Sequence, residues 1–136
     1  MTAKKLKTVN VAKNNYKIFL GKAKDFYEVM LNSRETGKWT AVGLNAVHCA
    51  ISCCYALLTF YLGIRSSGED HMQAVDLLLR LPPDIEEGEV NTFKWIIVKK
   101  NLIAYECREF RQTEAIEISK LAERFYRWTT SKLPAL

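Results

Sequence analysis

The feature that most constrains this chain is a stretch from Trp39 to Ile64 that contains no charged side chain. As a helix, this stretch is long enough to cross a bilayer. A helix that is apolar on most of its sides is either a membrane span or the central helix of a bundle. The segments around it are amphipathic and need an apolar partner to pack on. We therefore expect a central helix in a soluble bundle and no contact with a membrane.

Two helices are predicted for the first half of the chain. Residues 10–34 place apolar side chains at three- and four-residue steps, which indicates an amphipathic helix that ends at Gly37. The charge-free stretch predicts a second helix over residues 39–63, closed by Gly63. A polar loop, residues 63–70, follows it.

A short third helix is expected to begin at Asp70. Aspartate is a good N-cap, and Gln73 three residues later completes a capping-box pattern. Pro82 and Pro83 should stop this helix, because the first proline disfavours a helical conformation before it and neither can donate a backbone hydrogen bond.

The last third of the chain predicts two more helices after an acidic loop at 84–89. Apolar periodicity indicates a fourth helix over residues 91–106. Thr113 is expected to cap the last helix, and Pro134 to end the ordered chain.

These elements predict an all-α fold, an antiparallel up-and-down bundle of four or five helices. No segment shows the alternation typical of a strand, and six glycines and three prolines are too few for a turn-rich β-sandwich or barrel. A length of 136 residues fits one domain, residues 1–136, with a flexible N-terminus at residues 1–9.

Positive charge is concentrated in the N-terminal third. Residues 1–38 carry nine basic and three acidic side chains, whereas the rest of the chain carries 11 basic and 12 acidic ones. Such a segment could attract phosphates. No alternation of aromatic and basic residues accompanies the charge, so a solvated helix face is the expected interpretation.

The four cysteines do not form the pattern of a secreted disulfide framework. Cys49, Cys53 and Cys54 share the charge-free stretch with His48, so a metal site is conceivable. The closely spaced pairs of zinc ribbons are missing, however, and we expect buried thiols between packed helices and no metal. With no apolar stretch after the N-terminal lysines, we expect no signal peptide and a cytoplasmic location.

The chain contains two histidines, His48 and His71. His48 lies midway along the charge-free helix and is expected to be a core or interface residue. His71 follows the polar loop, six residues after Arg65, and this pair could bind an anion or an RNA phosphate. In the alternative, Arg65 pairs with Glu69 or Asp70 on an exposed loop.

Several segments, taken in order, resemble the HEPN family (higher eukaryotes and prokaryotes nucleotide-binding domains), in its small stand-alone prokaryotic type. Asn45–Leu58, which ends in Tyr-Ala-Leu-Leu, resembles the second helix of that family, and His71 resembles the histidine that opens its third helix. Lys100–Tyr105 resembles the family's Arg-Asn-x-x-x-His/Tyr segment. Glu114–Trp128 resembles its last helix.

The resemblance implies a helical bundle that is usually a dimer and is often paired with a nucleotidyltransferase as toxin and antitoxin. Active members are metal-independent ribonucleases with an arginine and a histidine four to six residues apart. There the histidine helps to deprotonate the ribose 2′-hydroxyl, and the arginine stabilises the crowded phosphate.

This chain departs from the family at the nuclease motif. Lys100 stands for the arginine and Tyr105 for the histidine, and a tyrosine is a poor base near neutral pH. We therefore expect a dimeric partner or binding protein with a degraded nuclease motif, in which Lys100, Asn101 and Tyr105 contact a nucleotide or phosphate. The alternative is an active, metal-independent ribonuclease toxin that uses Arg65 and His71, with no cofactor in either case.

A dimer seam is a further expectation. Small residues along the charge-free helix permit close approach of another helix, and Trp95 and Trp128 could fill a groove between subunits.

Overall fold

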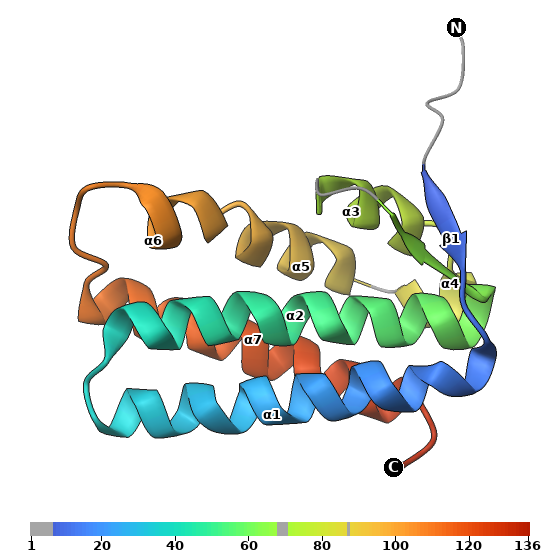
Figure 1. Ribbon diagram of the computed structural model, residues 1–136, viewed down its shortest axis with the longest axis horizontal. Coiled ribbons are helices and arrows are strands. Elements are labelled where there is room, and N and C mark those ends of the chain that lie inside the picture. The colour runs from blue at the N-terminus through green and yellow to red at the C-terminus, as the bar shows by residue number, and fades with distance from the viewer. Residues whose placement is uncertain (1–6, 68–70, 87) are drawn as a thin grey trace, which may run out of the picture.

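A computed structural model describes residues 7–67, 71–86 and 88–136 and shows a mostly helical protein, as the sequence predicts (Figure 1). Its elements are β1 (Thr8–Asn10), a 3-10 turn (Lys13–Asn15), α1 (Tyr16–Glu35), α2 (Trp39–Leu62), β2 (Ile64–Ser66), α3 (Met72–Leu78), α4 (Pro83–Glu86), α5 (Glu89–Ile97), α6 (Lys100–Tyr105) and α7 (Gln112–Lys132). In Figure 1, α2 lies between α1 on one side and α5 and α6 on the other, with α7 behind it. The helices therefore form a bundle around α2.

The charge-free helix α2 occupies the centre of this bundle, as predicted. It packs against α1, α7, α5, α6 and α3. It is the one helix in the described part of the chain that is long and apolar enough to cross a membrane, and 72% of its most apolar window is buried inside the protein. The apolar faces of the other helices cover the apolar sides of α2, which a membrane would otherwise have to cover.

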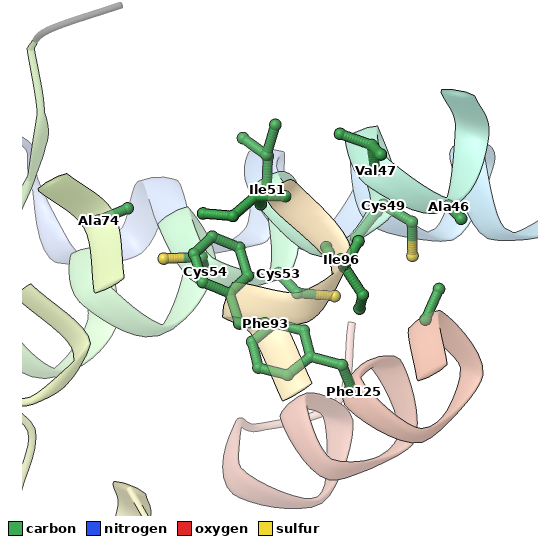
Figure 2. Close-up of a cluster of buried hydrophobic side chains, with 14 of the residues drawn as sticks. Ala46, Val47, Cys49, Ile51, Cys53, Cys54, Ala74, Phe93, Ile96 and Phe125 are labelled. Atoms are coloured by element: carbon green, nitrogen blue, oxygen red, sulfur yellow. The ribbon is translucent and has the colours of Figure 1, made fainter. Parts of the chain in front are cut away.

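Small side chains allow the neighbouring helices to approach α2 closely. At Gly43, a Cβ atom would lie 2.7 Å from Cε2 of Phe110 and 3.0 Å from Cδ1 of Ile103, so only glycine fits the present packing. Figure 2 shows Cys53 next to Phe93 of α5 and Phe125 of α7. The two phenylalanine rings stack with centroids 5.4 Å apart, and both are fully buried.

The turns at both ends of α2 match the sequence analysis. Gly37, after α1, and Gly63, after α2, both have positive φ angles, of 71° and 66°. Glycine adopts this left-handed conformation without the steric penalty of a side chain. The predicted first helix begins later than residue 10, because α1 starts at Tyr16.

A small sheet contradicts the prediction that the chain has no strand. β1 pairs antiparallel with β2, with Val9 opposite Arg65. Thr8–Asn10 therefore belong to a strand. Gly63 turns the chain out of α2 and back along this segment, where its carbonyl accepts a hydrogen bond from the Val11 N–H at 2.8 Å. A three-residue strand is too short to show a sequence alternation.

The prediction of one continuous fourth helix over residues 91–106 is also wrong. It consists of two helices, α5 and α6, separated by a turn at Val98 and Lys99. The turn redirects α6 so that Ile103 packs at Gly43 of α2, while α5 packs against α7. Hydrophobic spacing along the chain does not reveal such a break, because both halves keep a helical apolar pattern.

Helix ends in the second half differ from the predicted caps. α3 ends at Leu78, before the two prolines, and Pro83 begins the short helix α4 inside the predicted acidic loop. Proline is favoured at a first helical position because its missing N–H needs no partner there. The predicted cap Asp70 lies outside the described residues.

The last helix is also capped by a residue other than the predicted Thr113. α7 begins at Gln112, and the Arg111 N–H donates a hydrogen bond of 3.2 Å to the carboxylate of Glu114. Glu114 also accepts two hydrogen bonds from Arg108, which lock this carboxylate over the helix start.

Candidate functional site

The structure places the predicted residue His71 beside Tyr55, and the charge of the predicted residue Arg65 influences the pKa of the same tyrosine. Tyr55 lies on α2, Arg65 on β2, and His71 directly before α3. The Tyr55 hydroxyl lies 3.5 Å from Nδ1 of His71, a long hydrogen bond. The charge of Arg65 reaches the same hydroxyl, because it lowers the pKa of Tyr55 against the effect of burial. We call these three residues the Tyr55 site.

The protonation state of Tyr55 bears on which group donates the hydrogen bond between Tyr55 and His71. Burial raises the pKa of Tyr55, the neighbouring Cys54 adds to the increase, and Arg65 offsets it only in part. The phenol therefore keeps its proton at neutral pH. A phenol is a better donor than a neutral imidazole N–H, and an imidazole nitrogen is a better acceptor than a phenol oxygen. The contact therefore fits the hydroxyl as the donor and Nδ1 as the acceptor when the His71 ring carries its proton on Nε2, and the reverse roles when the proton is on Nδ1.

Neighbouring elements hold the Tyr55 site in place. The ring of Phe19 from α1 meets the Tyr55 ring edge-on at 5.6 Å, and the ammonium group of Lys22 lies 6.0 Å from the centre of Phe19. Nη1 of Arg65 donates a hydrogen bond of 2.9 Å to the carbonyl of Ser66. Strand pairing with β1 fixes the backbone of Arg65. The alternative pairing of Arg65 with Glu69 or Asp70 lies outside the described residues.

One buried polar atom beside Arg65 has no partner within the described part of the chain. Ser66 is 1% exposed, and its Oγ makes no hydrogen bond there. A buried hydroxyl normally has a hydrogen-bond partner, because an unsatisfied one costs free energy.

The second predicted set, Lys100, Asn101 and Tyr105, lies elsewhere. Lys100 begins α6 and lies close enough to His48 to lower its pKa, in addition to the larger lowering caused by burial of the ring. Tyr105, at the other end of α6, is 77% exposed. His48 and Tyr55 are seven residues apart on α2, which corresponds to about 10 Å along the helix. The structure therefore keeps Lys100 apart from the Tyr55 site.

His48 contradicts the prediction of a core histidine. The residue is exposed at the surface, although one side of its ring packs on Phe26 of α1 with centroids 5.3 Å apart, and this contact gives the ring its partial burial. Position in the middle of an apolar helix does not by itself show which of its sides the other helices cover. The predicted place of His48 in an interface remains a prediction.

The three cysteines of α2 are buried, as predicted, and all four cysteines of the chain are free. Burial raises the pKa of Cys53 and of Cys54, so both remain neutral thiols with little nucleophilic or metal-binding character. Within the described ranges, no group of three or more His, Cys, Asp or Glu side chains could hold a metal ion.

Basic side chains of the N-terminal third are exposed on α1, as expected for a solvated face. Two of them also lie over aromatic rings, although the sequence shows no aromatic–basic alternation. The ammonium group of Lys13 lies 4.4 Å from the centre of Phe60, and that of Lys22 lies over Phe19. Packing of the 3-10 turn on α2 creates the first pair, and the second joins residues three positions apart on α1.

A concave surface lies between the α5–α6 turn and α7, away from the Tyr55 site. It has a volume of about 330 Å³ and is lined by Trp95, Lys99, Phe110, Glu114, Glu117, Ile118 and Leu121. Trp95 is 64% exposed at its rim. Trp128, the other tryptophan of the predicted dimer seam, is half-buried against Phe125 within one chain, with centroids 5.6 Å apart.

Sequence reasoning did not single out Tyr55 as a functional residue. The sequence feature that could have pointed to Tyr55 is its position in the Tyr-Ala-Leu-Leu segment, eight residues before Gly63, the glycine that turns the chain toward Arg65. No protein-family model and no curated protein matches this chain. The likeness to HEPN domains therefore depends on the sequence motifs, and the mostly helical fold is compatible with it.

Proposed function

We propose that this protein is a HEPN-like helical bundle that binds the phosphate of a nucleotide or RNA at the Tyr55 site without cleaving it. In this proposal it acts in the cytoplasm as a dimeric partner of a nucleotidyltransferase in a toxin–antitoxin pair. The order of the sequence motifs and the helical bundle around α2 support the family assignment.

The hydrogen bond between Tyr55 and His71 is the observation that carries the binding role. With Nδ1 accepting from the phenol, the ring proton of His71 lies on Nε2, so in this proposal the imidazole acts as a hydrogen-bond donor and not as a base. A general base for ribose needs a lone pair instead. The Arg65 guanidinium and an imidazole N–H are both donors, which suits a phosphate oxygen.

The residues at the family's usual nuclease position support the same conclusion. Lys100 and Tyr105 lie at opposite ends of α6, and Tyr105 is 77% exposed. A solvent-exposed phenol has no feature that would make it a base near neutral pH. In the proposal, Lys100 contributes charge to a second phosphate contact. That contact lies beside His48, which is about two helical turns from Tyr55 along α2.

A metal-independent ribonuclease is the second candidate, and one observation favours it. His71 lies 3.5 Å from the Tyr55 hydroxyl, and the charge of Arg65 lowers the pKa of the same tyrosine, so both family residue types influence one side chain although they come from different elements. If His71 instead carried its proton on Nδ1 and donated to Tyr55, Nε2 would carry the lone pair that a base for a 2′-hydroxyl needs. Arg65 would then stabilise the phosphate as charge develops.

The experiment that separates these functions measures binding and cleavage in one sample. A short fluorescent RNA is mixed with the protein in the presence of EDTA, anisotropy is recorded, and the same sample is then run on a denaturing gel. The proposal predicts bound and intact RNA. Arg65→Ala and His71→Ala should each weaken binding at least about tenfold, because each removes a charged or charge-assisted hydrogen bond.

Lys120→Ala is the matched control, since it removes an exposed charge from α7. It should leave binding nearly unchanged. Metal-free cleavage that His71→Ala abolishes would overturn the proposal in favour of the ribonuclease. RNA that is neither bound nor cleaved would overturn both functions.

A further inference from the structure

The groove between the α5–α6 turn and α7 has walls of opposite charge. Lys99 lines the wall formed by the turn, whereas Glu114 and Glu117 line the wall formed by α7. Glu114 is already engaged, because it accepts hydrogen bonds from Arg108 and from the Arg111 N–H. Lys99 and Glu117 are exposed, and no ion pair joins either of them to another residue of the described chain.

The floor and rim of the groove are apolar. Phe110, Ile118 and Leu121 line it, and Trp95 stands at its edge with 64% of its surface exposed. The volume of about 330 Å³ exceeds that of one indole ring. Exposed tryptophan is uncommon on a soluble surface and is enriched at the centre of protein interfaces.

This pattern is complementary to itself. A two-fold axis that runs along the groove, parallel to its walls, would place Lys99 of each copy against Glu117 of the other copy, with the Trp95 rings beside the apolar floors. Isologous dimers require such a self-complementary patch. A uniformly acidic partner would attract Lys99 but repel Glu117, and a uniformly basic partner would do the reverse. Either repulsion disfavours association.

We propose that this groove is the interface through which two copies of this chain associate, with reciprocal Lys99–Glu117 pairs and Trp95 as the apolar anchor. The inference rests on the dimeric state in the proposed function and assigns the surface that forms it. It also moves the predicted seam away from α2, whose small residues are already buried against neighbouring helices of the same chain.

Charge reversal tests this pairing directly. Lys99→Glu and Glu117→Lys each create two like-charge contacts in a symmetric dimer, so each variant alone should dimerise at least about tenfold more weakly than the wild type. A one-to-one mixture of the two variants restores both attractive pairs, because positions 99 and 117 then carry opposite charges at both contacts between the chains. Multi-angle light scattering and analytical ultracentrifugation should therefore show monomers for each variant and a heterodimer for the mixture.

A matched pair of variants on α1 provides the control. Lys24→Glu and Glu28→Lys reverse exposed charges on α1, outside the groove lining, and should leave the dimer unchanged. Trp95→Lys should also give a monomer. Rescue by mixing cannot arise from misfolded variants, so it reports the interface itself.

Three results would overturn the inference. If Lys99→Glu and Glu117→Lys remain dimers, the dimer exists but forms elsewhere. If the mixture stays monomeric, Lys99 and Glu117 do not pair between chains. If the wild type is a monomer at high micromolar concentration, both the interface and the proposed dimer fail, whereas phosphate binding at the Tyr55 site is tested separately by RNA anisotropy.

Discussion

Replacing Gly43 by alanine tests the close approach between α2 and the segment that contains α6 and Phe110. A Cβ atom at this position would lie 2.7 Å from Cε2 of Phe110 and 3.0 and 3.2 Å from two atoms of Ile103. Both neighbours are buried, at 8% and 6% exposure, so neither can turn into solvent without exposing apolar surface. Gly21, in the middle of α1, is the matched control, because nothing lies within 4 Å of its added Cβ.

The magnitude follows from two opposing effects. Alanine in a helix interior is favoured over glycine by about 1 kcal/mol, and this gain applies to both positions. Overpacking a filled core costs about 1–3 kcal/mol, and this cost applies only at Gly43. Gly21→Ala should therefore stabilise the protein by up to about 1 kcal/mol, whereas Gly43→Ala should range from neutral to about 2 kcal/mol less stable.

The difference between the two variants isolates the steric cost, because the helix propensities cancel. It should be about 1–3 kcal/mol, or about 3–10 °C in Tm for a chain of this size. Urea and thermal denaturation followed by far-UV circular dichroism measure it. Phe110→Leu in the Gly43→Ala background should recover part of the loss. Equal or greater stability of Gly43→Ala relative to Gly21→Ala would refute the described packing.

Two further predictions concern titrating side chains. Because burial and Lys100 lower the pKa of His48, the folded state binds this proton less tightly than the unfolded chain, so the free energy of unfolding should fall as the pH drops through about 6.5. Lys100→Ala should raise the pKa of His48, measured by NMR titration of its ring protons, and an unchanged value would contradict their proximity. Hydrogen bonds from Arg108 hold the pKa of Glu114 at about 2, so its contribution to stability should be present above about pH 4.3 and lost as the pH falls toward 2. Glu114→Gln should flatten this acid limb in urea denaturation, and an unaltered limb would contradict the assignment.

The central helix could be predicted because its signal is local and strong. A stretch without charge must be covered by apolar surface, and the amphipathic segments on both sides supply that surface. The turn glycines, Gly37 and Gly63, could be predicted for the same reason, since a left-handed backbone favours glycine whatever the tertiary context.

Features that depend on distant contacts could not be predicted. The break between α5 and α6 follows from the packing of Ile103 at Gly43, which is 60 positions earlier in the sequence. The pairing of β1 with β2 joins segments that no local pattern links. The exposure of His48 likewise depends on which side of α2 the neighbouring helices leave uncovered.

The residue types and spacing of Arg65 and His71 predict a site, and its role in binding or cleavage stays a prediction. The structure places His71 beside the Tyr55 hydroxyl, and the charge of Arg65 lowers the pKa of that tyrosine. Tyr55 was missed because a tyrosine in an apolar helix is ordinarily a packing residue. Only its distance to His71 shows that its hydroxyl can form a hydrogen bond with that imidazole.

The most direct measurement of the central claim is the nitrogen-15 NMR spectrum of the His71 ring during titration with inorganic phosphate. The account predicts a neutral imidazole with its proton on Nε2, and a shift of that N–H signal as phosphate binds. Tyr55→Phe should shift the tautomer balance toward Nδ1, because the phenol proton that held Nδ1 as an acceptor is gone. A wild-type ring with its proton on Nδ1, or one that phosphate leaves unchanged, would contradict the account.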